Sequence, residues 1–448
     1  MTKPTRASNS KSNKKVHIIS LGCVKNTVDS EIIAGGLESA GIELVDEAED
    51  ANTIIINTCG FIGDAKEESV EVILDAAQLK SEGKLEELLV AGCLSARYKK
   101  ELTAEMPEVD KFFVTEDFRN IFDHIASKPH LADDPDHRRK LLTPRHFAYL
   151  KISEGCDNVC SFCAIPLMRG GQRSRDIESL VNEANSLVAR GVKEMLVIAQ
   201  DSTTYGWDLK PKRYLHELLT ELDQVEGLEW IRLHYAHPAH FSRKLIPILK
   251  NAKRIVPYLD IPVQHASSNM LTAMKRGLDA DGLRRLFVEL REEIPNLRLR
   301  TSVIVGFPGE TQADFDTLLD FLEEIQFDRL GVFMYSEEED TSGAELEDDV
   351  PQEVKVDRMD AVMGLQHSIS YNKNQELIGQ NLDVIIDAPD PENEGQMLGR
   401  TIWDAPEIDQ VVYIRGSYEL GSIQTLMVND AGPYELYASQ KSSETDRS

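Results

Sequence analysis

The chain contains 448 residues, which is too many for one ordinary hydrophobic core and predicts two to three domains. Its composition, 41% hydrophobic and 28% charged, is typical of a globular protein, and no apolar run reaches the roughly 18 residues that span a bilayer. The formal net charge of −28 disfavours binding to phosphate backbones and favours a basic partner, although acidity that only serves solubility is an alternative explanation.

The first fifteen residues, "MTKPTRASNSKSNKK", are polar and basic and lack the apolar core of a secretory signal. We therefore expect a disordered tail over residues 1–14 and a cytoplasmic location. Disulfides are disfavoured in a reducing compartment, so the six cysteines point to metal binding or catalysis.

Residues 15–130 alternate short apolar runs with amphipathic stretches. The runs are "VHIISLGC", "ANTIIINTCGF", "LEELLVAGC" and "KFFVTED". Such runs are typical of buried parallel strands, and the segments between them, such as residues 64–79, are typical of crossover helices. The pattern predicts a small doubly wound α/β domain, followed by a charged linker over residues 131–146.

Residues 147–376 contain six further candidate strands: "AYLKIS", "EMLVIAQ", "WIRLHYA", "VPYLDIPVQ", "LRTSVIVGF" and "RLGVFMYS". Amphipathic helices separate them, and we expect Gly191 to follow the first of these helices and Thr311 to cap a later one. Six βα units predict an open, partial (β/α)6 barrel, because a closed barrel needs two more units. One further helix is expected over residues 352–377.

Residues 377–440 show the short alternating runs "LDVIID", "QVVYIRG" and "IQTLMVND", separated by turn residues. They predict a small antiparallel β-barrel, followed by a disordered tail over residues 441–448. From Leu377 to Ser448 there are thirteen Asp and Glu against four Lys and Arg, a net charge of −9.

The segment "EGCDNVCSFCAIP" holds Cys156, Cys160 and Cys163 in a loop expected after the first strand of the partial barrel. Barrel enzymes carry their catalytic groups on this face. Three thiolates can bind three irons of a 4Fe–4S cluster and leave the fourth iron open for a ligand that is not protein. The alternative is a zinc knuckle completed by a histidine, but no Cys or His follows at zinc-finger spacing.

This Cys-x3-Cys-x-Phe-Cys motif resembles that of the radical S-adenosylmethionine superfamily. The resemblance implies that the open iron binds S-adenosylmethionine and that one electron cleaves it to methionine and a 5′-deoxyadenosyl radical. It also implies cofactor contacts from Phe162, from Gly306 in "VIVGFPGE", and from Gln200 at the end of the second strand. Close strand packing is an alternative role for Gly306.

The other three cysteines, Cys23, Cys59 and Cys93, each end one apolar run of the first domain. If these runs are parallel strands, the three thiols emerge at one carboxyl edge, where open α/β sheets bind ligands. Free cysteines that only fill a core are the alternative. We infer a second, auxiliary 4Fe–4S cluster with an open iron.

Two such sites resemble those of methylthiotransferases. Within that group the chain resembles the ribosomal protein aspartate methylthiotransferases over residues 16–437, in the segments "SLGCVKNTVDSE", "NTCGFIGDAKEES", "AGCLSARY", "YLKISEGCDNVCSFCAIPLMRGGQRSR", "YLDIPVQHAS" and "GRTIWDAPEID". Val24 stands where proline is usual, and Gln410 places a side chain in a turn where glycine is usual. The terminal barrel resembles a TRAM domain.

The resemblance implies a transferase that places a methylthio group on the β-carbon of an aspartate in small-subunit ribosomal protein twelve. One S-adenosylmethionine would supply the methyl group, a second would supply the radical, and the auxiliary cluster would deliver sulfur. A low-potential electron donor such as flavodoxin or ferredoxin is implied as a further partner, and no membrane partner is expected.

Sister enzymes of this group modify adenosines in transfer RNA, which is the first alternative. An acidic terminal barrel is poorly suited to RNA and well suited to a basic ribosomal protein, so we expect no tight transfer-RNA binding and expect Asp404, Glu407 and Asp409 to assist docking. A second alternative is a non-catalytic iron–sulfur carrier, which would not bind S-adenosylmethionine.

Several other polar residues lie near the expected strand ends. A structural role is favoured over a catalytic one for His234, His237 and His265, and Asp201 follows Gln200 at a strand end where the superfamily often contacts the methionine moiety. Three arginines are expected to pair either with the carboxylate of the cofactor or with acidic groups of the protein: Arg169, Arg173 and Arg175.

Overall fold

The computed structural model describes residues 14–126 and 139–440, so residues 1–13 and 441–448 of the two expected tails and the first half of the expected linker, residues 131–138, lie outside the described residues. The chain forms two compact units, Met1–Leu142 and Thr143–Ser448, which are described separately below. In the described part of both units, no helix has the length and apolar character needed to cross a membrane.

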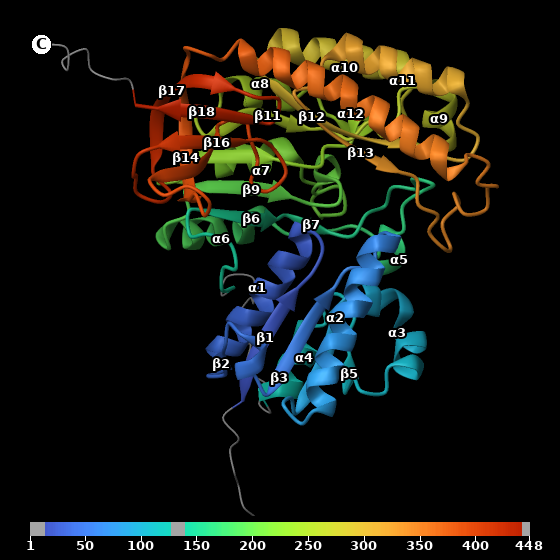
Figure 1. Ribbon diagram of the computed structural model, residues 1–448, viewed down its shortest axis with the longest axis vertical. Helices are drawn as coiled ribbons and strands as arrows, with labels where there is room; N and C mark the ends of the chain where they lie inside the picture. The colour runs from blue at the N-terminus through green and yellow to red at the C-terminus, as the bar shows by residue number, and fades with distance from the viewer. Residues whose placement is uncertain (1–13, 127–138, 441–448) are drawn as a thin grey trace, which may run out of the picture. The chain divides into compact units, whose positions relative to one another are not determined.

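The first unit is built on a five-stranded parallel sheet with the strand order β2-β1-β3-β4-β5 (Figure 1). Its strands are β1 (Lys15–Ser20), β2 (Glu43–Leu44), β3 (Thr53–Thr58), β4 (Glu87–Gly92) and β5 (Lys111–Phe112). Its helices are α1 (Val24–Ser39), α2 (Gly63–Ser81), α3 (Cys93–Glu105) and α4 (Phe118–Ala126). Strands β3 and β4 are almost wholly buried, as expected of continuous apolar runs in a parallel sheet.

The helices cover both faces of this sheet. On one face, Ile54 and Val90 pack with residues of α2 and α3; on the other, Ile55 and Leu89 pack with residues of α1 and α4. Successive residues of each strand thus enter different cores, because side chains alternate across a sheet. The predicted doubly wound α/β fold is confirmed.

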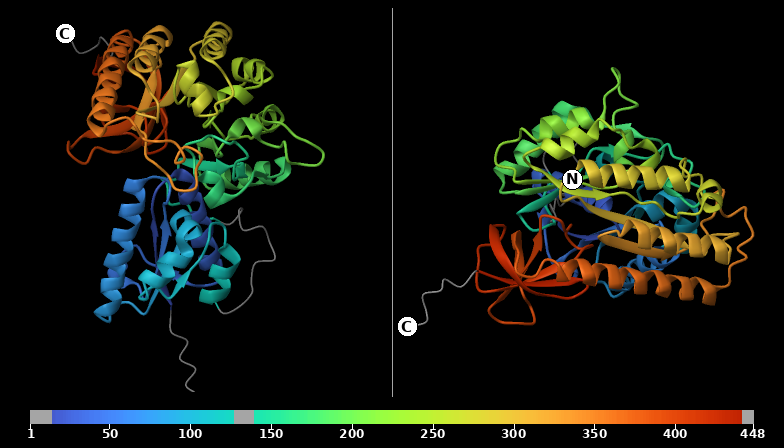
Figure 2. Two further views of the ribbon diagram at one scale, coloured as in Figure 1. Left: turned by 90° about the vertical axis from the view of Figure 1, so that its right-hand side faces the viewer. Right: turned by 90° about the horizontal axis from the view of Figure 1, so that it is seen from above.

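The second unit begins with a six-stranded sheet of order β13-β12-β11-β10-β9-β6, in which every neighbouring pair is parallel. Its strands are β6 (Phe147–Lys151), β9 (Glu194–Ile198), β10 (Trp230–Leu233), β11 (Ile255–Asp260), β12 (Arg298–Val305) and β13 (Arg329–Met334). All six predicted strands form, and β6 does not pair with β13, so the predicted open, partial barrel is confirmed (Figure 2).

Helices connect these strands: α6 (Ile177–Ala189), α7 (Leu215–Leu222), α8 (Leu245–Asn251), α9 (Ser268–Ala273), α10 (Ala280–Glu293) and α11 (Gln312–Ile325). Thr311 caps α11 as predicted. Its side chain accepts a hydrogen bond from the N–H of Asp314, and the Asp314 carboxylate accepts one from the N–H of Thr311. Gly191 follows the end of α6, also as predicted. The predicted terminal helix is α12 (Gln352–Gln375), which packs along β13 and α11.

The chain ends in a closed barrel of order β14-β15-β16-β18-β17. Its strands are β14 (Asn381–Pro389), β15 (Gln396–Thr401), β16 (Val411–Arg415), β17 (Ile423–Ala431) and β18 (Glu435–Ser439). The barrel is not wholly antiparallel as predicted, because β16 and β18 pair in parallel. After β16 the chain crosses to pair with β14 as β17, and β18 then returns between β17 and β16 in the direction of β16.

The loop 402–410 of this barrel fits against the amino-terminal ends of the six-stranded sheet (Figure 1). Asp404 accepts hydrogen bonds of 2.9 and 2.6 Å from Arg329, and Asp409 lies 3.4 Å from Arg300 and accepts 2.8 Å from the Tyr258 hydroxyl. Both carboxylate side chains are fully buried. The expectation that they assist docking is therefore wrong, because ion pairs with the sheet remove them from the surface.

Gln410, which stands where glycine is usual, is buried in the same region. Its amide oxygen accepts 2.8 Å from Asn374 of α12, and its amide nitrogen lies 3.4 Å from Asp404. Glu407 alone of the three docking candidates is exposed. The barrel, α12 and the sheet thus share one buried polar network.

Candidate functional site

The three-cysteine loop leaves the carboxyl end of β6 and is closed by a short hairpin. Strand β7 (Ser153–Glu154) pairs with β8 (Arg173–Ser174), and the Cys156 N–H donates to Gly170 at 3.1 Å. This is the end of the sheet opposite to the terminal barrel. The loop therefore lies on the face that carries catalysis in barrel enzymes.

All three thiols of the loop line one hollow of about 490 Å³, together with Pro166, Lys275 and residues 340–342. This volume falls within the roughly 300–1,000 Å³ that is typical of small-molecule sites. The structure thus brings Cys156, Cys160 and Cys163 together at a site with room for a cluster and a bound small molecule.

Each thiol of this loop accepts at least one hydrogen bond. The Asn158 N–H lies 3.4 Å from the sulfur of Cys156, Arg276 lies 3.1 Å from that of Cys160, and the backbone of Ile165 donates to Cys163. Burial raises the pKa of Cys156 to about 11 and that of Cys163 to about 12. Because metals bind the thiolate, assembly of a cluster here must release protons, and the three donors offset part of the cost of the buried negative charge.

A buried carboxylate, Glu154, lies at the start of the cysteine loop and binds three side chains around it. It accepts hydrogen bonds from Lys151 at 2.7 Å, Arg169 at 2.8 Å and Gln200 at 2.6 Å. Burial alone would raise the pKa of Glu154, but the two cations lower it well below its usual range. Arg169 and Gln200, both candidates for cofactor contacts, are therefore held by the protein's own carboxylate.

The two other cofactor candidates have packing partners. Phe162 packs against a cluster that contains Met274, Phe307 and Tyr335. Gly306 has φ +73°, and a Cβ there would lie 2.3 Å from the Lys355 side chain of α12. Close approach of a lysine therefore explains this glycine without a ligand.

The three predicted histidines all have protein partners. His234 lies 3.6 Å from Asp260, and His265 accepts the N–H groups of Ala266 and Ser267 at 2.9 and 3.0 Å. His237 accepts the N–H of Ala239 and stacks on the ring of His240, with centroids 4.7 Å apart. These contacts agree with the structural role that was favoured.

Asp201, His237 and His240 bring three metal-ligating groups within 4.8 Å of one another. The Asp201 carboxylate, however, already accepts from Asn158 at 2.8 Å, the Thr203 N–H at 2.9 Å and His240 at 2.9 Å. This carboxylate thus orients Asn158 of the cysteine loop through hydrogen bonds and has no need of a cation.

The remaining arginine candidates also have protein partners. Arg175 donates to Glu183 at 2.6 Å, and Arg173 donates to the carbonyls of Arg169 and Gly171. The two predicted alternatives were pairing with the carboxylate of the cofactor and pairing with acidic groups of the protein. Arg169 and Arg175 pair with acidic groups of the protein.

In the first unit, the three cysteines all lie at the carboxyl edge of the sheet, as predicted. Cys23 precedes α1, Cys59 follows β3, and Cys93 begins α3 directly after β4. The strand register pairs Thr58 with Gly92, which places Cys59 and Cys93 side by side. A Cβ on Gly22 would lie 2.7 Å from the sulfur of Cys59, so the loop before Cys23 also touches this thiol.

One buried amide, Asn26, joins the three cysteine loops. Its nitrogen donates to the carbonyls of Leu21 and Thr58, both at 2.9 Å, and its oxygen lies 3.7 Å from the sulfur of Cys93. Sequence reasoning did not identify Asn26, although it lies three residues after Cys23. It also missed Arg276, because no sequence signal relates this residue to a cysteine 116 positions earlier.

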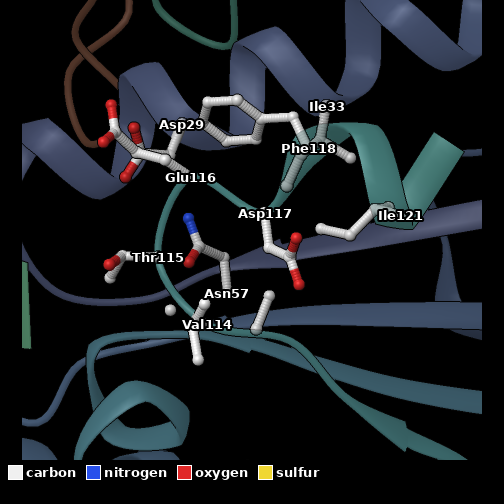
Figure 3. A pocket seen from close by; sticks show the side chains of 11 residues that line it. Asp29, Ile33, Asn57, Val114, Thr115, Glu116, Asp117, Phe118 and Ile121 are labelled. Atoms are coloured by element: carbon white, nitrogen blue, oxygen red, sulfur yellow. The ribbon is translucent and has the colours of Figure 1, made fainter.

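A small crevice lies beside the same sheet edge. Figure 3 shows Asn57 of β3 next to the loop 114–117 and Phe118 of α4, with Asp29 and Ile33 of α1 above it. Its volume of about 10 Å³ is at the lower limit of the space that holds one water molecule, so the crevice offers no ligand site.

Both cysteine sites fit three-ligand iron–sulfur clusters. Soft thiolates are the usual ligands of such clusters. The site of the second unit presents three thiols from one loop, and that of the first unit presents three from loops at one sheet edge. The site of the second unit lies at the catalytic end of an open six-stranded barrel. Fold and site together define a radical S-adenosylmethionine protein.

Comparison with known proteins agrees with this class and narrows it. The chain matches the radical SAM superfamily over residues 150–322, the uncharacterized protein family UPF0004 over residues 15–114, and the TRAM domain over residues 378–440. The fold resembles that of a radical S-adenosylmethionine methyltransferase, TsrM, from Kitasatospora setae, with a TM-score of 0.54 and 14% identity over 74% of each chain.

The chain is also similar to curated proteins named ribosomal protein uS12 methylthiotransferase RimO. That of Anaeromyxobacter sp. (strain K) is 48% identical over 94% of this chain and 92% of its own length. That of Myxococcus xanthus is 47% identical over 95% of this chain and 91% of its own length. That of Bacteroides fragilis is 45% identical over 95% of this chain and 98% of its own length. The chain therefore belongs to the ribosomal protein uS12 methylthiotransferase family.

Proposed function

We propose that this chain is a transferase that adds a methylthio group to the β-carbon of an aspartate in ribosomal protein uS12. The convergence of three thiols on one hollow at the catalytic end of the barrel carries this proposal, together with the family to which the chain belongs. We also propose a cytoplasmic location, where this substrate is made, and a low-potential donor such as flavodoxin or ferredoxin.

The residues of the second unit divide the work of binding. Cys156, Cys160 and Cys163 hold a 4Fe–4S cluster, and the hollow beside them receives S-adenosylmethionine and the substrate side chain. When bound, these groups supply a radical that can remove hydrogen from an unactivated carbon, which lies beyond ordinary acid–base chemistry. Phe162, Gly306 and Gln200 remain proposed cofactor contacts, of which Gln200 has one amide oxygen buried without a hydrogen-bond partner.

The first unit supplies the sulfur site in this proposal. Cys23, Cys59 and Cys93 hold an auxiliary 4Fe–4S cluster, and Asn26 fixes the loops that carry them. Cys23 is exposed, whereas Cys59 and Cys93 are buried. A partly exposed three-thiol site leaves one side open for a sulfur that is to be transferred.

The surface charge supports a protein substrate rather than RNA. Exposed acidic side chains cover the terminal barrel, namely Asp383, Glu392, Glu394, Glu407, Glu419 and Asp430. Affinity for RNA depends on neutralisation of phosphates by basic residues, whereas an acidic surface attracts a basic ribosomal protein. Methylthiolation of transfer-RNA adenosine is the second candidate function.

The test is mass spectrometry of the substrates. The reconstituted, reduced enzyme is incubated with S-adenosylmethionine and either uS12 or unmodified transfer RNA. We expect the mass increase of one methylthio group on a uS12 aspartate and none on transfer RNA. Modified transfer RNA with unmodified uS12 would establish the second candidate instead.

Reversal of exposed charge on the barrel tests how the substrate docks. The variant replaces three exposed glutamates of the barrel by lysine: Glu392, Glu394 and Glu419. We expect it to associate with uS12 at least tenfold more slowly at low salt, because exposed complementary charges speed the encounter of two proteins. The difference should shrink above physiological ionic strength, where the Debye length falls below about 8 Å. Stopped-flow or surface-immobilised binding gives the rates.

A matched control carries the same change in net charge elsewhere. Lysine replaces three exposed acidic residues of α10 and α11: Glu292, Asp320 and Glu323. This control should associate nearly as fast as the parent chain. Equal slowing of both variants would mean that only total charge matters and that the barrel is not the docking surface.

A further inference from the structure

Arg276 is a buried cation that contacts the cysteine loop directly. Its side chain lies just beyond α9, and the residue is 5% exposed. One guanidinium nitrogen donates to the sulfur of Cys160 at 3.1 Å, and a second donates to the carbonyl of Pro262 at 2.7 Å. The third nitrogen, Nε, is buried without a hydrogen-bond partner.

The contact between Arg276 and Cys160 is held by the backbone on both sides. Ser161, the residue after Cys160, donates its N–H to the carbonyl of Met274 at 3.2 Å and its hydroxyl to that of Ala273 at 2.8 Å. Arg276 donates its own N–H to the carbonyl of Leu271 at 2.9 Å. The cysteine loop and the turn that carries Arg276 therefore form one fixed assembly.

Arg276 differs from the other donors to these thiols in its charge. Cys156 and Cys163 receive hydrogen bonds from the neutral backbone groups of Asn158 and Ile165. Hydrogen bonds from a cation are roughly twice as strong as neutral ones, and a low local dielectric strengthens them further. Among the described residues, Arg276 is thus the charged hydrogen-bond donor to these three thiols.

We propose that Arg276 is a positioning residue that raises the reduction potential of the cluster held by Cys156, Cys160 and Cys163. Reduction adds one electron and hence one negative charge to the cluster. A charged donor to a cluster sulfur stabilises that more negative form, since hydrogen bonds to the sulfurs and nearby charge set the potentials of such clusters. The inference rests on the proposed function only in requiring a 4Fe–4S cluster at this loop.

The test is a redox titration followed by electron paramagnetic resonance in the full chain. Cys23, Cys59 and Cys93 are changed to alanine in every sample, so that only the cluster of the second unit contributes. Arg276→Met removes the charge and the donor, whereas Arg276→Lys retains the charge on a flexible stem. The matched control is Arg254→Met, which removes a partly buried arginine directly before β11, at the other end of the sheet, whose guanidinium donates to the carbonyl of Leu228 at 2.9 Å.

We expect Arg276→Met to lower the ratio of reduced to oxidised cluster at least tenfold at a fixed potential, which equals 59 mV for a one-electron couple. Arg276→Lys should fall between Arg276→Met and the parent, and Arg254→Met should change the ratio less than threefold. Iron content is measured in each sample. Absence of iron from the parent background would refute the proposed cluster itself, which separates that failure from a failure of this inference.

Two results would overturn the inference. The first is a reduction potential that is unchanged in Arg276→Met. If binding of S-adenosylmethionine is also weakened in that variant, Arg276 is a ligand of the cofactor instead. If Arg276→Met does not retain iron, electron–nuclear double resonance decides, on the chain that keeps Arg276 but has alanine at Cys23, Cys59 and Cys93, with ¹⁵N-labelled arginine. A ¹⁵N coupling to the reduced cluster that changes in Arg276→Lys supports the inference, and its absence refutes it.

Discussion

Replacement of Cys156, Cys160 and Cys163 together by alanine is expected to abolish cleavage of S-adenosylmethionine and to halve the iron content. Two 4Fe–4S clusters give about eight irons per chain after anaerobic reconstitution, and each triple variant should retain about four. Loss of activity should be complete, because these thiols line the hollow that receives the cofactor and no other cysteine of the second unit can replace them.

The matched variant changes Cys23, Cys59 and Cys93 instead. It should also lose half of the iron, yet still form 5′-deoxyadenosine, because these thiols belong to the other compact unit. It should not methylthiolate uS12. Iron analysis, absorbance near 400 nm and chromatography of the nucleoside products measure these outcomes. A full iron content in this variant would exclude the auxiliary cluster.

Asp404→Asn is expected to destabilise the second unit by about 3–5 kcal/mol, the usual cost of leaving one member of a buried ion pair without its partner. The Asp404 side chain is fully buried, and Arg329, itself 12% exposed, would lose the carboxylate that accepts two of its hydrogen bonds. Its loop joins the terminal barrel to the six-stranded sheet, so we expect sheet and barrel to lose stability together. Thermal and urea unfolding measure the change.

Glu394→Gln is the matched control for this experiment. It removes one negative charge from an exposed turn of the same barrel, and isolated surface charges contribute about 0–1 kcal/mol. We expect a change in stability close to zero. If Asp404→Asn were equally mild, the buried network would not join the barrel to the sheet.

The sequence alone determined the fold class and the grouping of the cysteines. Continuous apolar runs specify buried parallel strands, because a strand covered on both faces tolerates few polar residues. Once the strands are parallel, residues that directly follow them meet at one edge, so the convergence of Cys23, Cys59 and Cys93 follows from their positions alone. The loop of Cys156 is equally local, since its thiols lie within eight residues.

Only the tertiary structure decided which polar groups surround these cysteines. Arg276 reaches Cys160 across 116 positions, and no periodicity encodes such a contact. The burial of Asp404 and Asp409 likewise depends on arginines near the starts of distant strands. A count of charges along the sequence does not show these contacts, so both residues were expected at the surface. Alternation of apolar and polar side chains predicts a strand but not the strand with which it pairs. The parallel pairing of β16 with β18 could therefore be seen only in the folded barrel.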